Sequence, residues 1–308
     1  MLLPPHSVST AQGVLLLGAS GFFGPALADE FGPSVLAKTY ASHAIPGGLR
    51  FDARQSSVAA LVGGLTVRPA AAVVMLGETN IDRCAKDPEG TAEINVKGVT
   101  RVIRELVALG IMPVFLSSDG VLDGTRALTS EDDDVRSILT YGRQKLEVER
   151  FIAGLPSPWL IIRLPKLLSL SPEPRCMLTQ WIGALQQGER IVCATDQFFT
   201  PAATVDAAKA VAALVRKRAS GLYHAGGPER LSRRALLQTV IDEYRNFAIP
   251  KVAIVECSLR DLQLREPRPL DTSMSSERFV SQCGPLIRPS SAIARLSVHS
   301  HFGGKTGG

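Results

Sequence analysis

The sequence predicts an α/β fold, with a doubly wound parallel sheet and a smaller C-terminal lobe. Short apolar runs alternate with segments of helical period through the first half of the chain, which is typical of parallel sheets. The first apolar run leads directly into a glycine-rich turn and a helix. From residue 165 onward this alternation gives way to segments rich in Pro and Ser.

Composition limits the classes of function. The chain has 308 residues, of which 45% are hydrophobic and 20% are charged, with 34 Lys and Arg against 29 Asp and Glu. These values exclude global disorder, and the mild positive charge suits a small anionic ligand. The basic residues are scattered, so no nucleic-acid partner is expected. Because no apolar run approaches the roughly 18–20 residues of a membrane span and no secretory signal is evident, we expect a cytoplasmic protein without a membrane partner.

The cysteines indicate neither disulfides nor a metal site. Cys84, Cys176, Cys193, Cys257 and Cys283 are far apart and form no CxxC pair or Cys/His cluster. Reduced, structural thiols are the expected state.

The sheet is expected to begin with an apolar strand at residues 13–18, followed by a helix at 25–31. Glycines at 18, 21 and 24 separate the two. Such a turn lets the backbone approach a pyrophosphate, and the helix N-terminus offers free N–H groups to the phosphates. Its place between strand and helix predicts a Rossmann-type dinucleotide site.

The second strand, at 34–41, bears on the choice of cofactor. A cofactor with a free 2′-hydroxyl usually meets a carboxylate at the end of this strand. Here the strand is followed by Ser42 and His43, which can donate hydrogen bonds to a 2′-phosphate. We therefore favour NADP(H) over NAD(H), although the same two residues can simply open a turn.

The remaining first-half elements follow from the same patterns. Strands are expected at 49–53, 70–77, 112–118 and 159–164, helices at 58–65, 90–109 and 145–153, and a loop at 78–89. Asp52, in the third strand, lies within expected reach of an adenine amino group. Ser118 ends the fifth strand, so it faces the same crevice as the glycine turn.

Tyr141 and Lys145 stand four positions apart at the start of a helix, so their side chains lie on one face. A nearby ammonium is expected to lower the pKa of the Tyr141 phenol, which suits proton exchange with a substrate hydroxyl or carbonyl. A pair with this spacing is also common on exposed helices without any function.

The second half is expected to contain a helix at 177–187, a turn-rich segment at 191–201 and an alanine-rich helix at 204–218. A strand at 221–224 and a helix at 233–244 capped by Ser232 follow, and residues 254–279 are expected to be irregular. These elements define the predicted domains. The dinucleotide-binding domain covers 13–164 with 203–225 returning to it, the substrate lobe covers 165–202 and 226–296, and disordered tails are expected at 1–12 and 297–308.

With these motifs in order, the chain resembles the extended short-chain dehydrogenase/reductases, and more closely dTDP-4-dehydrorhamnose reductase and related sugar-nucleotide reductases. The motifs that carry the resemblance are the glycine turn, Asp82-x-Cys84 through Pro88-Glu89 to Asn95, Ser117-Ser-Asp-Gly-Val-Leu-Asp-Gly124, Tyr141-Gly-Arg-Gln-Lys145, Asp196-Gln-Phe-Phe-Thr-Pro201, Gly221-Leu-Tyr-His224 and Arg268-Pro269. It spans about residues 13–279.

The resemblance implies a reductase of a keto-sugar that is nucleotide-linked or similar. Tyr141 is implied to be the general acid, Lys145 to hold the nicotinamide ribose and lower the pKa of Tyr141, and Ser118 to hydrogen-bond the carbonyl. The implied cofactor contacts are Gly18, Ser20, Gly21, Phe22, Phe23, Gly24, Ser42, His43, Asp52, Ala53, Leu76, Gly77, Tyr141 and Lys145. The implied substrate contacts are Ser118, Asp119 and Lys166, which stands where the reductases have a tryptophan.

Several alternatives remain open at this point. An epimerase of the same fold would return the hydride to the same carbon, and a non-catalytic subunit like the β-subunit of methionine adenosyltransferase would bind NADP without turnover. A 4,6-dehydratase is disfavoured because Asp119 is followed by Gly120 instead of the glutamate that elimination requires. A sugar or sugar-nucleotide substrate is the expected partner, and a homodimer is possible.

Overall fold

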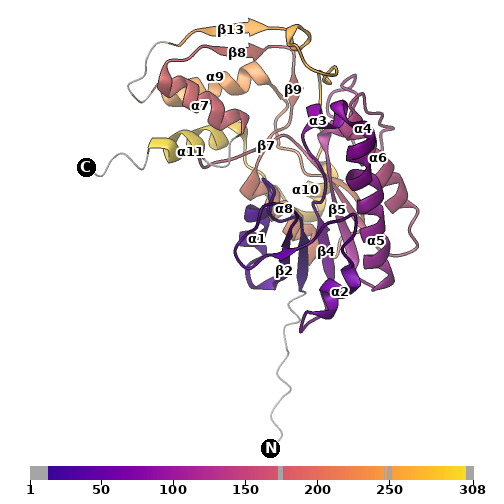
Figure 1. The fold of residues 1–308 in the computed structure, drawn as a ribbon. Coiled ribbons are helices and arrows are strands. Elements are labelled where there is room, and N and C mark those ends of the chain that lie inside the picture. Colours follow the sequence, from indigo (N-terminus) through magenta and orange to yellow (C-terminus); the bar gives the residue numbers. More distant parts are fainter. Residues whose placement is uncertain (1–12, 173–175, 246, 248–251, 303–308) are drawn as a thin grey trace, which may run out of the picture.

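A computed structural model of the chain describes residues 13–172, 176–245, 247 and 252–302. Its centre is a sheet of seven parallel strands in the order β11-β6-β5-β4-β1-β2-β3 (Figure 1). The strands are β1 (Val14–Leu17), β2 (Val35–Tyr40), β3 (Leu49–Arg50), β4 (Ala71–Val74), β5 (Met112–Ser118), β6 (Leu160–Leu164) and β11 (Gly221–His224). The predicted α/β, Rossmann-type fold class is confirmed.

Strand order determines where a ligand can bind. The chain moves outward from β1 to β2 and β3 on one side, and from β4 to β5 and β6 on the other, so the order reverses between β1 and β4. Open sheets bind ligands outside the carboxyl ends of the strands at such a reversal. The glycine turn follows β1 and Ser118 ends β5, so both belong to this edge.

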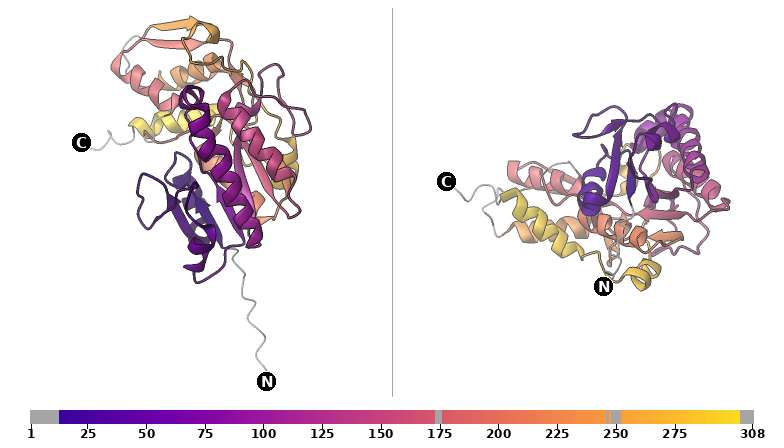
Figure 2. Two further views of the ribbon diagram at one scale, coloured as in Figure 1. Left: turned by 45° about the vertical axis from the view of Figure 1, so that its right-hand side comes forward. Right: turned by 90° about the horizontal axis from the view of Figure 1, so that it is seen from below.

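Two helical layers cover the sheet (Figures 1 and 2). Helices α1 (Gly24–Phe31), α8 (Thr204–Arg216) and α10 (Glu277–Cys283) lie on one face, and α2 (Val58–Gly63), α5 (Val99–Ala108) and α6 (Thr140–Ala153) lie on the other. Strand residues alternate between the two cores: Leu16 and Val114 pack under α1 and α8, whereas Leu15 and Phe115 pack under α5. Burial on both faces explains the continuous apolar runs.

The segment between β4 and β5 is more structured than predicted. Residues expected to form a loop include helix α3 (Ile81–Lys86), because Asn80 accepts a hydrogen bond from the Arg83 N–H at 3.0 Å and caps it. The expected single helix at 90–109 is α4 (Pro88–Ala92), a π-helical turn (Glu93–Gly98) and α5. Such π turns are frequent at functional sites.

The C-terminal lobe, at the top of Figure 1, has its own core. Its helices are α7 (Met177–Gln187), α9 (Arg233–Tyr244) and α11 (Ser290–Phe302), and its strand pairs are β8 (Ile191–Ala194) with β13 (Ile254–Cys257), β9 (Phe198–Phe199) with β12 (Leu231–Ser232), and β7 (Leu167–Leu168) with β10 (Ala202–Ala203). β13 lies in a segment predicted to be irregular. Its pairing with the distant β8 leaves no local pattern in the sequence.

The end of the chain also differs from the prediction. A disordered tail was expected from residue 297, yet α11 continues to residue 302, and Ser297 and Val298 are fully buried. Helix α11 packs on α9 and α7, so burial offsets its weak amphipathicity. The expected tails at 1–12 and 303–308 lie outside the described residues. Within the described part of the chain, no helix has the length and apolarity to cross a membrane.

Candidate active site

The glycine turn has the backbone geometry of a phosphate cradle. Gly18 has φ +88°, a conformation that side chains rarely adopt, and a Cβ on Gly24 would lie 2.0 Å from the Ala19 carbonyl oxygen. Ala19 N–H donates to the Thr39 carbonyl at 2.7 Å, which ties the turn to β2. No side chain caps α1, whose N-cap residue is Phe23. Of the first residues of α1, Gly24 already donates its N–H to the Gly21 carbonyl at 3.1 Å and Pro25 has no N–H, which leaves the Ala26 N–H for an anion.

The other predicted residues of this turn differ in exposure. Phe23 is buried in the core beside α1, Ser20 is half-buried, and Gly21 and Phe22 are exposed. The space beside Gly21 is open. A Cβ added at this position would have the Gly18 carbonyl oxygen, at 3.6 Å, as its nearest neighbour.

Ser42 and His43 follow the end of β2 and are exposed. The Ser42 hydroxyl and His43 Nδ1 share a hydrogen bond of 3.1 Å. The segment 41–48 carries no carboxylate. Both side chains can turn toward a ligand at the edge of the sheet.

Asp52 is already engaged by a neighbour. Its carboxylate accepts hydrogen bonds from Arg54 Nε at 3.0 Å and Nη2 at 2.7 Å, and this contact lowers the pKa of Asp52 to about 2. Ala53 is buried, and its carbonyl accepts a hydrogen bond from Arg101 at 2.7 Å. A contact between Asp52 and an adenine would therefore have to share the carboxylate with Arg54.

Asn95 holds the segment after β4, where Leu76 and Gly77 lie. The Asn95 side chain accepts from the Glu78 N–H at 2.7 Å and donates to the Glu78 carbonyl at 3.0 Å, and it also donates to Gln144 on α6 at 2.7 Å. Asn95 is 4% exposed and belongs to the π-helical turn. One buried amide thus links the end of β4 to the helix that carries Tyr141.

Ser118 and Tyr141 meet at the end of β5. Ser118 Oγ accepts from the Gly120 N–H and donates to Asp119, both at 3.0 Å. A Cβ placed on Gly120 would lie 3.4 Å from both Ser118 Oγ and Tyr141 Cδ1, so the two side chains flank one point. The structure thus brings the Ser118 and Tyr141 side chains together at the end of β5.

The pKa of Tyr141 differs from the expectation. It is raised, mainly because the phenol is buried and secondarily by the charges of Asp119 and Cys84, while the hydrogen bond from Ser118 acts in the opposite direction. The Lys145 ammonium lies 5.7 Å from the Tyr141 ring centroid and donates to the Leu116 carbonyl at 3.0 Å. Burial also lowers the pKa of Lys145 to about 8. The expectation that Lys145 lowers the pKa of Tyr141 is therefore not met in this structure, because desolvation dominates.

Behind Lys145 lies a buried ionic cluster. Glu149, one turn further along α6, forms an ion pair with Arg163 Nη2 at 2.7 Å, and Ser117 donates a hydrogen bond to the same carboxylate. Arg163 Nη1 contacts His224 Nε2 at 3.2 Å, and His224 Nδ1 lies 3.2 Å from the Ser275 carbonyl. Because the guanidinium can only donate, His224 Nε2 accepts and Nδ1 carries the proton.

His224 makes stability depend on pH. Burial, followed by the charge of Arg163, lowers the pKa of His224 from 6.5 to about 3. Between these two pKa values the unfolded chain binds a proton at His224 that the folded chain does not. The free energy of unfolding therefore has its full contribution from neutral His224 above pH 6.5 and loses it as pH falls toward about 3. We expect the urea-derived unfolding free energy to fall less steeply between pH 7 and pH 5 in His224→Gln than in the parent. Equal slopes would contradict this assignment.

A cavity of about 450 Å³ opens beside Asp119 and Gly120, between the sheet edge and the lobe. Its cationic side chains are Lys166, Arg233 and Arg268. Lys166 is exposed and its charge acts on Asp119, whose pKa is raised by burial. Arg233 Nε is buried with no hydrogen-bond partner among the described residues, whereas Arg268 forms an ion pair with Asp82 at 2.6 Å.

The structure therefore groups Ser118, Asp119, Tyr141 and Lys145 around the end of β5, and Lys166 lines the same cavity as Asp119. Asp52 and Ala53 are further along the edge and carry other contacts. Asn95 and Arg233 were not among the predicted site residues. Asn95 could have been identified as a polar residue between apolar neighbours in a helical segment. No sequence pattern distinguishes Arg233 from a surface arginine. The described residues contain no cluster of three or more potential metal ligands, counting His, Cys, Asp and Glu.

Comparison with known proteins agrees with this geometry. The family described as RmlD substrate binding domain matches residues 12–294. A dTDP-4-dehydrorhamnose reductase from Sinorhizobium fredii is 23% identical over 215 residues, which is 67% of this chain and 72% of that protein. The methionine adenosyltransferase 2 subunit beta of Rattus norvegicus is 26% identical over 164 residues, 51% of this chain, so the match spans about half (47%) of that curated relative.

Among solved structures, a dTDP-4-dehydrorhamnose reductase from Bacillus anthracis in complex with NADP superposes with a TM-score of 0.79 at 21% identity, covering 92% of this chain and 97% of that one. This likeness shows the shared fold. From the match over residues 12–294, the chain belongs to the RmlD substrate-binding domain family and has the fold of the extended short-chain dehydrogenase/reductases.

Proposed function

We propose that the protein is an NADP(H)-dependent reductase of a nucleotide-linked keto-sugar. The observation that supports this most strongly is the convergence of Ser118 and Tyr141 at the end of β5, with Lys145 one helical turn behind. A nicotinamide cofactor supplies the hydride when bound. The Ala26 N–H in the first turn of α1 and the space at Gly21 fit its pyrophosphate.

The chain's own residues would bind and polarise the carbonyl. The hydroxyls of Ser118 and Tyr141 donate to its oxygen, which stabilises the negative charge that develops there. Tyr141 then gives up its proton to that oxygen. A phenol with a pKa of about 10 or higher is protonated at neutral pH, so Tyr141 carries the proton that the reducing direction requires.

Ser42 and His43 support the choice of NADP(H). They are exposed at the end of β2, where a carboxylate would repel a 2′-phosphate. The solved structure from Bacillus anthracis is a complex with NADP, which fits a nicotinamide cofactor; the preference for NADP(H) over NAD(H) rests on Ser42 and His43. On this proposal, NADPH binds more tightly than NADH.

The cavity supports a substrate that carries phosphate. Lys166 and Arg233 face a space of about 450 Å³, and the buried Arg233 Nε has no partner among the described residues. A diphosphate would satisfy that donor and neutralise both cations. The attached sugar would then lie near Asp119, which lines the same cavity.

The proposal predicts a decline of activity in alkaline solution. Because the pKa of Lys145 is lowered to about 8, the ammonium loses its proton as pH rises through that value. We expect kcat/KM for reduction, which reports the free enzyme, to fall above about pH 8. In Lys145→Arg this decline should move to higher pH, since a guanidinium stays charged. A pH profile that is flat to pH 10 in the parent would contradict the assignment.

The proposed function is tested by offering a panel of 4-keto sugar nucleotides with NADPH or NADH and following cofactor absorbance. We expect oxidation of NADPH with at least one of these compounds, and slower oxidation of NADH. Absence of turnover across the panel, with NADPH bound, would overturn the reductase.

A second candidate is a non-catalytic NADP-binding subunit. The similarity to the methionine adenosyltransferase 2 subunit beta supports it. In that case NADPH would bind without turnover and a larger protein would co-purify with the chain. Ser118, Tyr141 and Lys145 together favour the reductase.

A further inference from the structure

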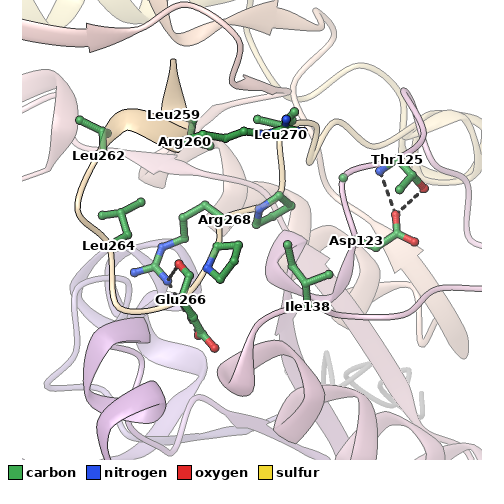
Figure 3. Close-up of a pocket in the computed structure, with 13 residues that line it drawn as sticks. Asp123, Thr125, Ile138, Leu259, Arg260, Leu262, Leu264, Glu266, Arg268 and Leu270 are labelled. Atoms are coloured by element: carbon green, nitrogen blue, oxygen red, sulfur yellow. Dashed lines mark hydrogen bonds and ion pairs between the residues drawn. The ribbon is translucent and has the colours of Figure 1, made fainter. Parts of the chain in front are cut away.

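One loop of the lobe, residues 258–270, forms a wall between two cavities; we name it the wall loop. Leu259, Leu262, Leu264, Arg268 and Pro269 line both cavities. One is the cavity next to Asp119, and the other has about 470 Å³ and is shown in Figure 3. Any ligand that fills the cavity next to Asp119 therefore contacts the wall loop.

The wall loop is fixed at both ends. At its start, Ser258 Oγ donates to Asp196 at 2.5 Å and the Leu259 N–H donates to the same carboxylate at 2.7 Å. Near its end, Arg268 donates to Asp82 on α3 at 2.6 Å. Its position is thus determined jointly by the lobe and by the sheet domain.

Between these anchors, the wall loop reaches the helix that carries Tyr141. Glu266 accepts hydrogen bonds from the Thr140 N–H at 3.0 and 3.2 Å and from the Thr140 hydroxyl at 3.1 Å. The N-cap residue of α6 is Leu139, which makes no side-chain cap. Glu266, 126 positions away, occupies the place of the missing cap, and its side chain is only 13% exposed.

A carboxylate at this place stabilises the first turn of α6 in two ways. It satisfies the Thr140 N–H, which has no partner within the helix, and its charge opposes the positive end of the helix dipole. Tyr141 is the residue next to Thr140, so the position of its phenol depends on this first turn. A displacement of about 1 Å at a reacting group can cost about a hundredfold in rate.

We propose that Glu266 is a positioning residue for Tyr141: it caps α6 from the wall loop and so couples a filled substrate cavity to the placement of the phenol. The proposal rests on the proposed function, because it takes Tyr141 as the acid. The contact of Glu266 with Thr140 is formed in this structure, and a ligand held against the wall loop would stabilise it during proton transfer.

Hydrogen–deuterium exchange of residues 137–146 tests the capping without requiring turnover. We expect the first-turn amides to exchange about fivefold or more faster in Glu266→Ala than in the parent, as for loss of a typical cap. Glu266→Gln, which keeps an acceptor, should lie between them. Gln263→Ala, at an exposed position of the same loop, should match the parent. Added dTDP should slow exchange in the parent and in Gln263→Ala, but not in Glu266→Ala.

Kinetics then separates positioning from stability alone. With a keto-sugar nucleotide that the parent reduces, Glu266→Ala should lose about tenfold to a hundredfold in kcat with little change in the affinity for NADPH, and Glu266→Gln should recover part of the loss. Unchanged exchange in Glu266→Ala, a response to dTDP equal to that of the parent, or faster exchange with an unchanged kcat would each overturn the proposal. Failure of the parent to reduce any keto-sugar would instead overturn the proposed function, and the exchange measurements would still decide whether Glu266 couples the cavity to α6.

Discussion

Tyr141→Phe is expected to lower kcat by about a hundredfold to ten-thousandfold while leaving NADPH affinity nearly unchanged, because it removes the general acid and little else. The phenol is buried at the end of β5, so the substitution deletes one oxygen without exposing the helix. Stopped-flow or steady-state oxidation of NADPH measures kcat, and fluorescence titration measures the affinity for the cofactor.

The matched control is Tyr244→Phe, which removes a phenol oxygen in the core of the lobe. It should leave kcat close to that of the parent. If Tyr141→Phe retained most of the parent's kcat, the proton donor would have to be another group, and the proposed role of Tyr141 would be abandoned.

Arg163→Met is expected to destabilise the fold by about 3–5 kcal/mol, the usual cost of leaving one partner of a buried ion pair without its counter-charge. The side chains of Arg163 and Glu149 are only 4% and 8% exposed. The Glu149 charge also favours the ammonium form of Lys145. Urea unfolding followed by circular dichroism gives the change in the free energy of unfolding.

The double variant Glu149→Gln/Arg163→Met should be less destabilised than Arg163→Met, since no buried charge is then left unpaired. Lys97→Met, which removes an exposed partner of Glu93, should change the free energy of unfolding far less. A double variant that is no more stable than Arg163→Met would show that lost packing, and not an unpaired charge, is the cause.

Local patterns were sufficient for the parts of the fold that local chemistry determines. β5, β11, α7 and α9 have the predicted bounds, and the Ser232 hydroxyl caps α9 by accepting from the Ala235 N–H at 3.0 Å. Each of these four elements has either an apolar run or a helical repeat of apolar residues, and residues that end the element follow it. The glycine turn and the meeting of Ser118 with Tyr141 follow from strand order, which alternating strands and helices determine.

Contacts between distant segments could not be predicted in this way. β13 pairs with β8 across about 60 residues, and Glu266 caps a helix 126 residues earlier. The pKa of Tyr141 illustrates the same limit in electrostatics. A helix places Lys145 beside it, but only the packed structure shows that burial and Asp119 outweigh that ammonium.

The most direct test of the central claim is transfer of deuterium from NADPH labelled at C4 of the nicotinamide into the sugar. In this account, the parent enzyme yields a sugar nucleotide that has gained one deuterium with one of the two C4 label stereoisomers, and Tyr141→Phe yields almost none. Mass spectrometry of the product reads both results. A parent protein that binds the labelled cofactor but leaves every keto-sugar nucleotide unlabelled would contradict the account.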